Sequence, residues 1–298
     1  MKIKVSVPAT SANIGSGFDA LGLAVTLYNT VTFEESEVLD ISSADGTRIP
    51  RGESNLVYRS AKGLFEKVGK QIPPLKITQT NPIPMARGLG SSSACIAAGI
   101  LGANALLGGP LEEKDILTFA TKLEGHPDNV APALLGGFVV SAYDEGHVYS
   151  LKKTIAPGIT FAAFIPDFKL LTEKARAALP KMVSHADAVY NLSRAALLAT
   201  AFCEERYDFL PVAAKDSLHQ QYRLPLIEGG EAVFALADGL GALATFISGA
   251  GPTILSVVRT AEANVFFERA QAALESDEEL AHFTLHRFVA DNEGAKVV

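Results

Sequence analysis

The sequence predicts a protein of mixed strands and helices that is divided into about two domains. Its 298 residues and its apolar fraction of 48% suit two domains of ordinary size with large buried cores. Residues 2–7 alternate between polar and apolar side chains, which is the pattern of a half-buried strand. The second half also mixes strand and helix patterns. Strands and helices are therefore expected in both halves.

The composition narrows the classes of function. The formal net charge of −7 argues against nucleic acid or an acidic membrane as the main partner. The two cysteines, Cys95 and Cys203, form no Cys-x-x-Cys pair and fit thiols in a reducing cytoplasm. The chain starts with a strand pattern rather than an apolar leader, and glycine or proline interrupts both long uncharged spans. We expect a cytoplasmic protein that binds no nucleic acid and no membrane.

In the first half, further patterns predict strands and helices in turn. Ser54 is the predicted cap of a helix with an apolar stripe, and Gly108-Gly109-Pro110 is a stop signal for the helix that starts near Ser92. Gly146 and the Lys152-Lys153 pair indicate a hairpin and then a linker, so a domain boundary is expected there. The predicted strands are 28–41, 75–80 and 138–142, and the predicted helices are 54–68, 92–107 and 111–123.

The second half has the same mixture. Thr172 is the predicted cap of its first helix, and Arg223 falls in an irregular stretch before Pro225. The segment 239–244 matches Gly-x-Gly-x-x-Ala but precedes a strand instead of following one, so it does not indicate a dinucleotide site. The predicted strands are 160–165, 243–247, 254–258 and 283–288, and the predicted helices are 172–179, 185–203, 207–218, 231–238 and 260–274.

The segment from Asn81 to Gly102 is the strongest candidate for a binding site. Gly88 and Gly90 permit positive φ and a close approach of ligand to backbone, and serines 91–93 then open a helix of small apolar residues. The free N–H groups and the dipole at such a helix end attract an anion. The segment lacks the lysine of a Walker A loop, and Ser93 breaks the Rossmann fingerprint. The alternative is a loop that only caps a core helix.

Two other loops carry polar residues among small and apolar ones. Asn13 and Asp19 lie in the loop that follows the first strand, where turn chemistry is the alternative to binding. Glu124, His126 and the Asp128-Asn129 pair cluster between a helix and a small-residue turn.

These separated segments together resemble the GHMP small-molecule kinases. The segment 84–94, Pro-Met-Ala-Arg-Gly-Leu-Gly-Ser-Ser-Ser-Ala, resembles their ATP-binding motif. The segment 8–23 resembles their N-terminal motif, and Ile-Ser-Gly-Ala-Gly-Pro-Thr at 247–253 resembles their third, glycine-rich motif. Within this superfamily, residues 10–23 and Gly-His-Pro-Asp-Asn-Val-Ala-Pro-Ala at 125–133 resemble the homoserine kinase family. The motifs follow the order of the family across nearly the whole chain.

The resemblance implies a two-domain α+β GHMP kinase fold. Residues 1–152 would resemble domain 2 of ribosomal protein S5 and carry the ATP-binding loop. Residues 153–298 would form a ferredoxin-like domain, with the ligand site between the two. The implied reaction moves the γ-phosphoryl group of ATP, with Mg²⁺, to the side-chain hydroxyl of L-homoserine, which gives O-phosphohomoserine for threonine biosynthesis. A homodimer is expected from the family.

The resemblance also implies which residues bind ATP and the metal ion. Asn55 matches a nucleoside contact, although it could equally cap its helix. Ser92 and Glu124 are the implied Mg²⁺ ligands, since hydroxyl and carboxylate oxygens suit this ion. Ser91 is the alternative to Ser92, and a surface carboxylate is the alternative role for Glu124. The implied phosphate loop comprises Pro84, Met85, Ala86, Arg87, Gly88, Leu89, Gly90, Ser91, Ser92, Ser93 and Ala94.

Homoserine is a zwitterion, so its site needs both charges. By resemblance, Asp19 binds the amino group and Arg176 and Arg223 bind the carboxylate, because an Arg fork fits a carboxylate. Thr172 shares a helix face with Arg176. An ordinary surface charge is the alternative for each arginine. The remaining implied substrate residues are Asn13, Gly249 and His126.

The acceptor hydroxyl is expected to contact Asn129, which can donate or accept a hydrogen bond but cannot act as a base. Some relatives carry an aspartate base in a similar loop, so Asp128 is the other catalytic candidate. We favour Asn129 facing the substrate, with the proton lost to the phosphate. His126 could also be a base, although a His before Pro is more often structural.

Three other functions compete with this interpretation. The chain could be a GHMP kinase for a different small alcohol, or a catalytically silent sensor of ATP and a metabolite. The failed fingerprint argues against a nucleotide-dependent oxidoreductase.

Overall fold

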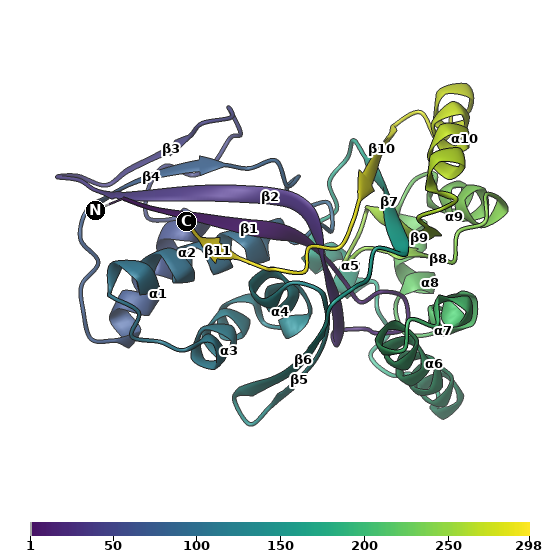
Figure 1. Cartoon of the computed structure of the whole chain (residues 1–298), viewed down its shortest axis with the longest axis horizontal. Coiled ribbons are helices and arrows are strands. Elements are labelled where there is room, and N and C mark those ends of the chain that lie inside the picture. The colour runs from purple at the N-terminus through teal and green to yellow at the C-terminus, as the bar shows by residue number, and fades with distance from the viewer. Residues whose placement is uncertain (1) are drawn as a thin grey trace.

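The computed structural model describes residues 2–298 and contains two β-sheets side by side, each packed against helices (Figure 1). The alternating residues at the start of the chain form the predicted strand, and Ile3, Val5 and Val7 are its buried members. One apolar cluster runs from Val5 and Phe33 in the first sheet to Phe161 and Leu255 in the second. This shared core fixes the two halves relative to each other.

The first sheet has seven strands in the order β11-β1-β2-β4-β3, with β5 paired to β2 and β6 paired to β5. Neighbours run antiparallel except β3 and β4, which are parallel. The strands are β1 (Lys2–Ala12), β2 (Leu21–Glu35), β3 (Asp40–Ser43), β4 (Leu75–Thr80), β5 (Phe138–Asp144), β6 (His147–Lys153) and β11 (Lys296–Val297).

Four helices cover one face of this sheet (Figure 1). They are α1 (Leu56–Lys67), α2 (Ser91–Leu106), α3 (Glu113–Glu124) and α4 (Pro127–Leu135). The α2 helix packs between α1 and the sheet, and its small residues let it pack closely on both sides. A Cβ atom on Gly99 would lie 2.4 Å from the Val57 carbonyl oxygen of α1, and one on Gly102 would lie 2.3 Å from the Phe33 ring of β2. These contacts hold the α2 N-terminus in place.

The second sheet has four antiparallel strands in the order β10-β7-β9-β8. Counted along the chain, this is the order 4-1-3-2 of a ferredoxin-like sheet, as the resemblance predicts. The strands are β7 (Ile159–Pro166), β8 (Ala244–Ile247), β9 (Ile254–Arg259) and β10 (Phe283–Phe288). The helices are α5 (Thr172–Ala177), α6 (His185–Cys203), α7 (Leu210–Ala213), α8 (Gln220–Arg223), α9 (Gly230–Gly239) and α10 (Ala263–Ser276), with single 3₁₀ turns at Tyr207–Phe209 and Leu224–Leu226.

The sheets change between Lys153 and Ile159, next to the boundary expected at 152–153. The C-terminal segment then returns to the first sheet, because β11 pairs with β1 and the Figure 1 C-terminus lies in that half. Residues 296–297 therefore belong structurally with the N-terminal half.

Five local expectations are wrong. Residues 124–129, expected as a loop, contain the end of α3 and the first turn of α4, so Asp128 and Asn129 are helical. Asn55, not Ser54, caps α1, and its side-chain oxygen accepts from Val57 N at 3.0 Å. Thr172 is the first residue inside α5 rather than its cap, which is Leu171. Arg223 ends the short helix α8 instead of lying in an irregular stretch. The helix expected over 207–218 is only a 3₁₀ turn followed by α7.

None of the helices within residues 2–298 combines the length and the hydropathy needed to cross a bilayer.

Candidate active site

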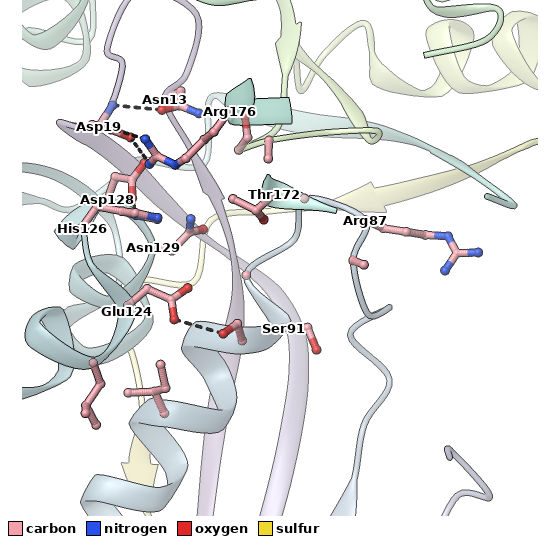
Figure 2. A pocket seen from close by; sticks show the side chains of 18 of the residues that line it. Asn13, Asp19, Arg87, Ser91, Glu124, His126, Asp128, Asn129, Thr172 and Arg176 are labelled. Carbon is pink, nitrogen blue, oxygen red and sulfur yellow. Dashed lines mark hydrogen bonds and ion pairs between the residues drawn. The ribbon is translucent and has the colours of Figure 1, made fainter. Parts of the chain in front are cut away.

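A cavity of about 380 Å³ lies where the two halves meet, and segments from the whole length of the chain line it (Figure 2). Most of the site residues predicted from the sequence line this cavity. Its lining comprises Asn13, Asp19, Leu56, Arg59, Ala86, Arg87, Gly88, Gly90, Ser91, Ser92, Ile96, Leu123, Glu124, His126, Asp128, Asn129, Thr172, Arg176, Arg223, Gly249 and Ala250.

The glycine-rich loop and the N-terminus of α2 form one end of the cavity. Gly88 and Gly90 have φ of 76° and 69°, a conformation that favours glycine. Neither has room for a side chain, because a Cβ atom would lie 2.2 Å from Ser248 O at Gly88 and 1.9 Å from Thr10 Oγ1 at Gly90. The hydroxyl of Ser248 also donates to Gly88 O at 2.6 Å. The loop is thus held against β1 and the 248–253 loop, with the open end of α2 facing the cavity.

Glu124, at the end of α3, binds two serines at the start of α2. The Ser92 hydroxyl donates to Glu124 Oε2 at 3.0 Å and the Ser93 hydroxyl donates to Oε1 at 2.8 Å. The Ser91 side chain points away from Glu124 (Figure 2). A carboxylate and hydroxyls that already converge are a donor set that fits Mg²⁺, which keeps water and phosphate oxygens as its other ligands.

Several residues of the implied phosphate loop do not present their side chains to the cavity. Arg87 points away from the other site residues (Figure 2), and its guanidinium donates to Pro166 O at 2.7 Å and to Asp167 O. Leu89, Ser93 and Ala94 are buried, while Pro84 and Met85 lie outside the lining. These residues could contact a ligand only through their backbone atoms.

Asn55 lies outside the cavity lining, so the nucleoside contact stays a prediction. It is 2% exposed, and its side chain bonds to Pro50 O, Val57 N and Gln79 Nε2. The cap is the role that the structure assigns to it. Its neighbours Leu56 and Arg59 line the cavity instead.

Asp19 and Arg176 form an ion pair at the other end of the cavity (Figure 2). Arg176 Nη2 donates to Asp19 Oδ1 at 2.8 Å, and Nη1 donates to Oδ2 at 3.1 Å. The hydrogen bond to Asp19 raises the pKa of Arg176 above its ordinary value, so the guanidinium stays charged. Asn13 Oδ1 accepts from the backbone N–H of Asp19, which has a φ of 55°. The two charges therefore neutralise each other.

Arg223 is a buried cation next to this pair. Only 1% of it is exposed, and its Nη1 donates to Gly249 O at 3.1 Å and lies 3.3 Å from His219 Nδ1. Burial, followed by repulsion from Arg176, lowers the pKa of Arg223 to about 10, which still leaves it charged at neutral pH. The Phe18 ring lies 5.2 Å from the Arg223 guanidinium carbon and stacks on His219. Arg223 thus has protein partners but no carboxylate hydrogen-bonded to it within residues 2–298.

Asn129 and Asp128, on the first turn of α4, lie between the two ends of the cavity. Asn129 Oδ1 accepts from the Thr10 hydroxyl at 2.8 Å. Asp128 is 2% exposed, and its Oδ1 contacts His126 Nδ1. Burial lowers the pKa of His126, but the hydrogen bond and the charge of Asp128 outweigh burial and leave this pKa above its ordinary value.

Asp19, His126 and Asp128 offer ligand atoms within 4.8 Å of one another, a spacing that a metal ion can use. Arg176 already binds both carboxylate oxygens of Asp19, however. A metal ion at this position would have to compete with that guanidinium for the Asp19 oxygens.

Comparison with known proteins agrees with this geometry. Residues 55–137 match the model of the GHMP kinases N terminal domain. A homoserine kinase from Caldicellulosiruptor bescii is 43% identical over 99% of this chain and 96% of its own length. One from Clostridium beijerinckii is 48% identical over 86% of both chains.

The chain belongs to the homoserine kinase family. The crystal structure of the homoserine kinase from Cytophaga hutchinsonii superimposes with a TM-score of 0.89 at 29% identity, covering 100% of this chain and 97% of that one. The family and the GHMP kinase fold predicted from the sequence are therefore confirmed, and the chain is an ATP-dependent kinase by its family.

The prediction missed four side chains at or behind the cavity. Arg59 lines it, and Thr10, Phe18 and His219 contact residues that line it. Thr10 and Phe18 were inside a recognised motif but are ordinary strand and loop residues by type. His219 is buried between Gly15 and Arg223, and its Nε2 lies 2.7 Å from Gly15 O. Arg223 is only four residues away, but Gly15 is 204 residues away, so no local pattern shows that His219 lies behind the site.

Proposed function

We propose that this chain transfers the γ-phosphoryl group of ATP to the side-chain hydroxyl of L-homoserine. The observation that carries the proposal is the cavity itself. One end holds a glycine loop, a helix N-terminus and Glu124 beside two serines, and the other holds Asp19, Arg176 and Arg223. The first end suits a triphosphate and a hard cation, and the second suits a small zwitterion. Membership of the homoserine kinase family supports the same assignment.

At the phosphate end, the backbone N–H groups of Gly88 to Ser93 would bind the phosphate oxygens. No lysine follows Gly90, so a metal ion and the dipole of α2 have to balance the phosphate charge. Ser92 and Glu124 would hold Mg²⁺, with Ser93 supporting Glu124. When bound, this ion neutralises charge on the transferred phosphoryl group.

At the substrate end, the homoserine amino group would bind Asp19 and its carboxylate would bind Arg176 and Arg223. Because Asp19 and Arg176 bind each other before substrate arrives, the zwitterion has to open that pair and replace each partner with its own charge. Asn13 and Thr172 would shape the wall around it. This exchange keeps both charges of the Asp19–Arg176 pair matched before and after binding, and it brings a carboxylate to Arg223.

Between the two ends, Asn129 would donate a hydrogen bond to the acceptor hydroxyl. The oxygen attacks the γ-phosphorus, so an O–P bond forms, the bond from the γ-phosphorus to the bridging oxygen breaks, and ADP leaves with that electron pair. The hydroxyl O–H bond breaks and its proton goes to an oxygen of the transferred phosphoryl group, because the Asn129 amide cannot accept it. Asp128, bound to His126, would hold the turn that carries Asn129. Positioning therefore supplies most of the rate enhancement.

The wider setting follows from the family. We propose a cytoplasmic homodimer whose product, O-phosphohomoserine, enters threonine biosynthesis. Light scattering behind size-exclusion chromatography tests the oligomeric state directly.

The test of the reaction is an acceptor panel. Purified protein is incubated with Mg-ATP and homoserine, mevalonate, galactose or shikimate, and ADP release is followed. We expect ADP release that depends on homoserine. Turnover of another alcohol without any turnover of homoserine would overturn the substrate, and ATP binding without turnover of any acceptor would favour a sensor.

A further inference from the structure

The buried hydroxyl of Thr10 lies directly behind the residue that faces the acceptor. Thr10 is on β1, is 0% exposed, and donates through Oγ1 to Asn129 Oδ1 at 2.8 Å across 119 residues of sequence. We propose that Thr10 is the positioning residue that fixes the Asn129 amide for the reaction. This inference rests on the function proposed above, because it concerns the same acceptor hydroxyl.

The direction of this hydrogen bond decides what Asn129 offers to substrate. The Thr10 hydroxyl has one proton, and that proton is used on Asn129 Oδ1. The Asn129 Nδ2 group has no protein partner among residues 2–298, while Asn129 lines the cavity. Asn129 therefore presents N–H donors, which orient a lone pair of the acceptor oxygen and leave its proton free to depart toward the phosphate.

Thr10 also links the phosphate loop to Asn129. Its backbone N–H donates to Leu89 O at 3.2 Å, and a Cβ atom on Gly90 would lie 1.9 Å from Thr10 Oγ1 and 3.2 Å from Asn129 Oδ1. Gly90 is thus packed against the Thr10 hydroxyl, which is itself bonded to the Asn129 amide. A single buried side chain couples the group that holds the acceptor to the loop that holds the donor.

Loss of the hydroxyl has a specific chemical consequence. Without the Thr10 donor, Asn129 Oδ1 loses its hydrogen-bond partner in a partly buried position, which is unfavourable. A half-turn of the amide would then place Oδ1 against the substrate hydroxyl, where it accepts the hydroxyl proton and holds that proton away from the phosphate. The reaction would slow although the charges that bind homoserine are untouched.

The experiment is a double-mutant cycle with Thr10→Val, Asn129→Ala and both changes together, read as kcat and KM for each substrate. We expect Thr10→Val to lower kcat about 10- to 100-fold, with both KM values within about threefold of wild type. In the Asn129→Ala background the same change is expected to lower kcat less than about threefold, because the amide is no longer there to be positioned. Thr10→Ser, which keeps the hydroxyl, is expected to retain more than about half of kcat.

Thr160→Val is the matched control, since it removes another buried hydroxyl, bonded to Thr260 in the second sheet, and is expected to leave kcat unchanged. An equal loss of kcat from Thr10→Val in both backgrounds, or wild-type kinetics in Thr10→Val, would overturn the proposal. If Thr10→Val does not fold, Thr10→Ala takes its place in the cycle under the same two criteria. Wild-type protein without homoserine-dependent ADP release would instead contradict the proposed function.

Discussion

Asp19 and Arg176 are 157 residues apart in the sequence, yet the two carboxylate oxygens of Asp19 accept hydrogen bonds from the two terminal nitrogens of Arg176, at 2.8 and 3.1 Å. Each side chain is still about one-third exposed, at 36% and 37%. The pair joins the loop after β1 to helix α5 and closes the substrate end of the cavity. A small zwitterion can exchange with it, because its two charged groups match the two that the pair releases.

The first prediction concerns Asp19→Asn. We expect the KM for homoserine to rise about 100-fold, because the substrate amino group loses its charged partner, while the KM for ATP stays within about twofold. Initial rates of ADP release over a range of homoserine concentrations measure both constants. The acceptor 4-hydroxybutyrate, which lacks the amino group, should react equally slowly with wild type and variant. An equal loss for both acceptors would mean that Asp19 does not bind the amino group. Arg206→Ala, which breaks an exposed bidentate pair with Asp208, is the control and should change neither KM.

The second prediction concerns Glu124→Gln. The amide retains hydrogen bonds to Ser92 and Ser93 but loses the charge that suits Mg²⁺. We expect kcat to fall about 100-fold and the half-saturating free Mg²⁺ to rise at least about fivefold. A Mg²⁺ titration at fixed Mg-ATP measures both. Ser91→Ala, at a hydroxyl that points away from Glu124 (Figure 2), should behave like wild type. An unchanged titration curve in Glu124→Gln would remove Glu124 from the metal site.

The third prediction compares Gly88→Ala with Gly46→Ala. Both glycines have positive φ, at 76° and 80°, but a Cβ atom would lie 2.2 Å from Ser248 O at Gly88 and has nothing within 4 Å at Gly46. We expect Gly46→Ala to lower the free energy of unfolding by about 1 kcal/mol from backbone strain alone. Gly88→Ala should cost at least about 3 kcal/mol and raise the KM for ATP, since the loop has to move. Urea unfolding measures the first quantity. Equal costs at the two positions would show that the packing against Ser248 is unimportant.

The fourth prediction concerns the pH dependence that His126 contributes. Its pKa is raised in the folded protein, because the hydrogen bond and charge of Asp128 outweigh the lowering effect of burial. The resulting stability is fully present below the unfolded pKa of about 6.5 and is lost as the pH rises through the folded pKa. We therefore expect His126→Asn to lose more free energy of unfolding at about pH 5.5 than at about pH 8.5. In an Asp128→Asn background the lowering effect of burial on the His126 pKa is no longer outweighed, so this pH-dependent difference should disappear or change sign. A loss that grows with pH would contradict the assignment.

The sequence was sufficient for those parts of the site that short segments encode. The loop from Gly88 to Ser93 needs glycine at fixed positions and a helix directly after it, so its local pattern carries the information. Glu124 and Asn129 lie in one motif for the same reason. Most buried strands and helices were placed within a few residues because their periodicity is local, but α4 was expected as a loop.

What the sequence could not give depends on contacts between distant residues. Thr10 and Asn129 are bonded across 119 residues, and neither residue type predicts the other. The mutual pairing of Asp19 and Arg176 was missed because each was assigned to the substrate. Asn55 shows a different limit. Its residue type fits both a nucleoside contact and a helix cap, and the cap is established only by its hydrogen bonds to Val57 and Gln79. Because β11 is only two residues long, no local pattern predicts that it returns to the first sheet.

The most direct test of the central claim is ³¹P nuclear magnetic resonance of the reaction of purified protein with Mg-ATP and L-homoserine. The account predicts one equivalent of ADP and one of a phosphomonoester whose phosphorus couples to the side-chain methylene protons of homoserine. ADP accompanied only by inorganic phosphate, or no loss of ATP, would contradict it.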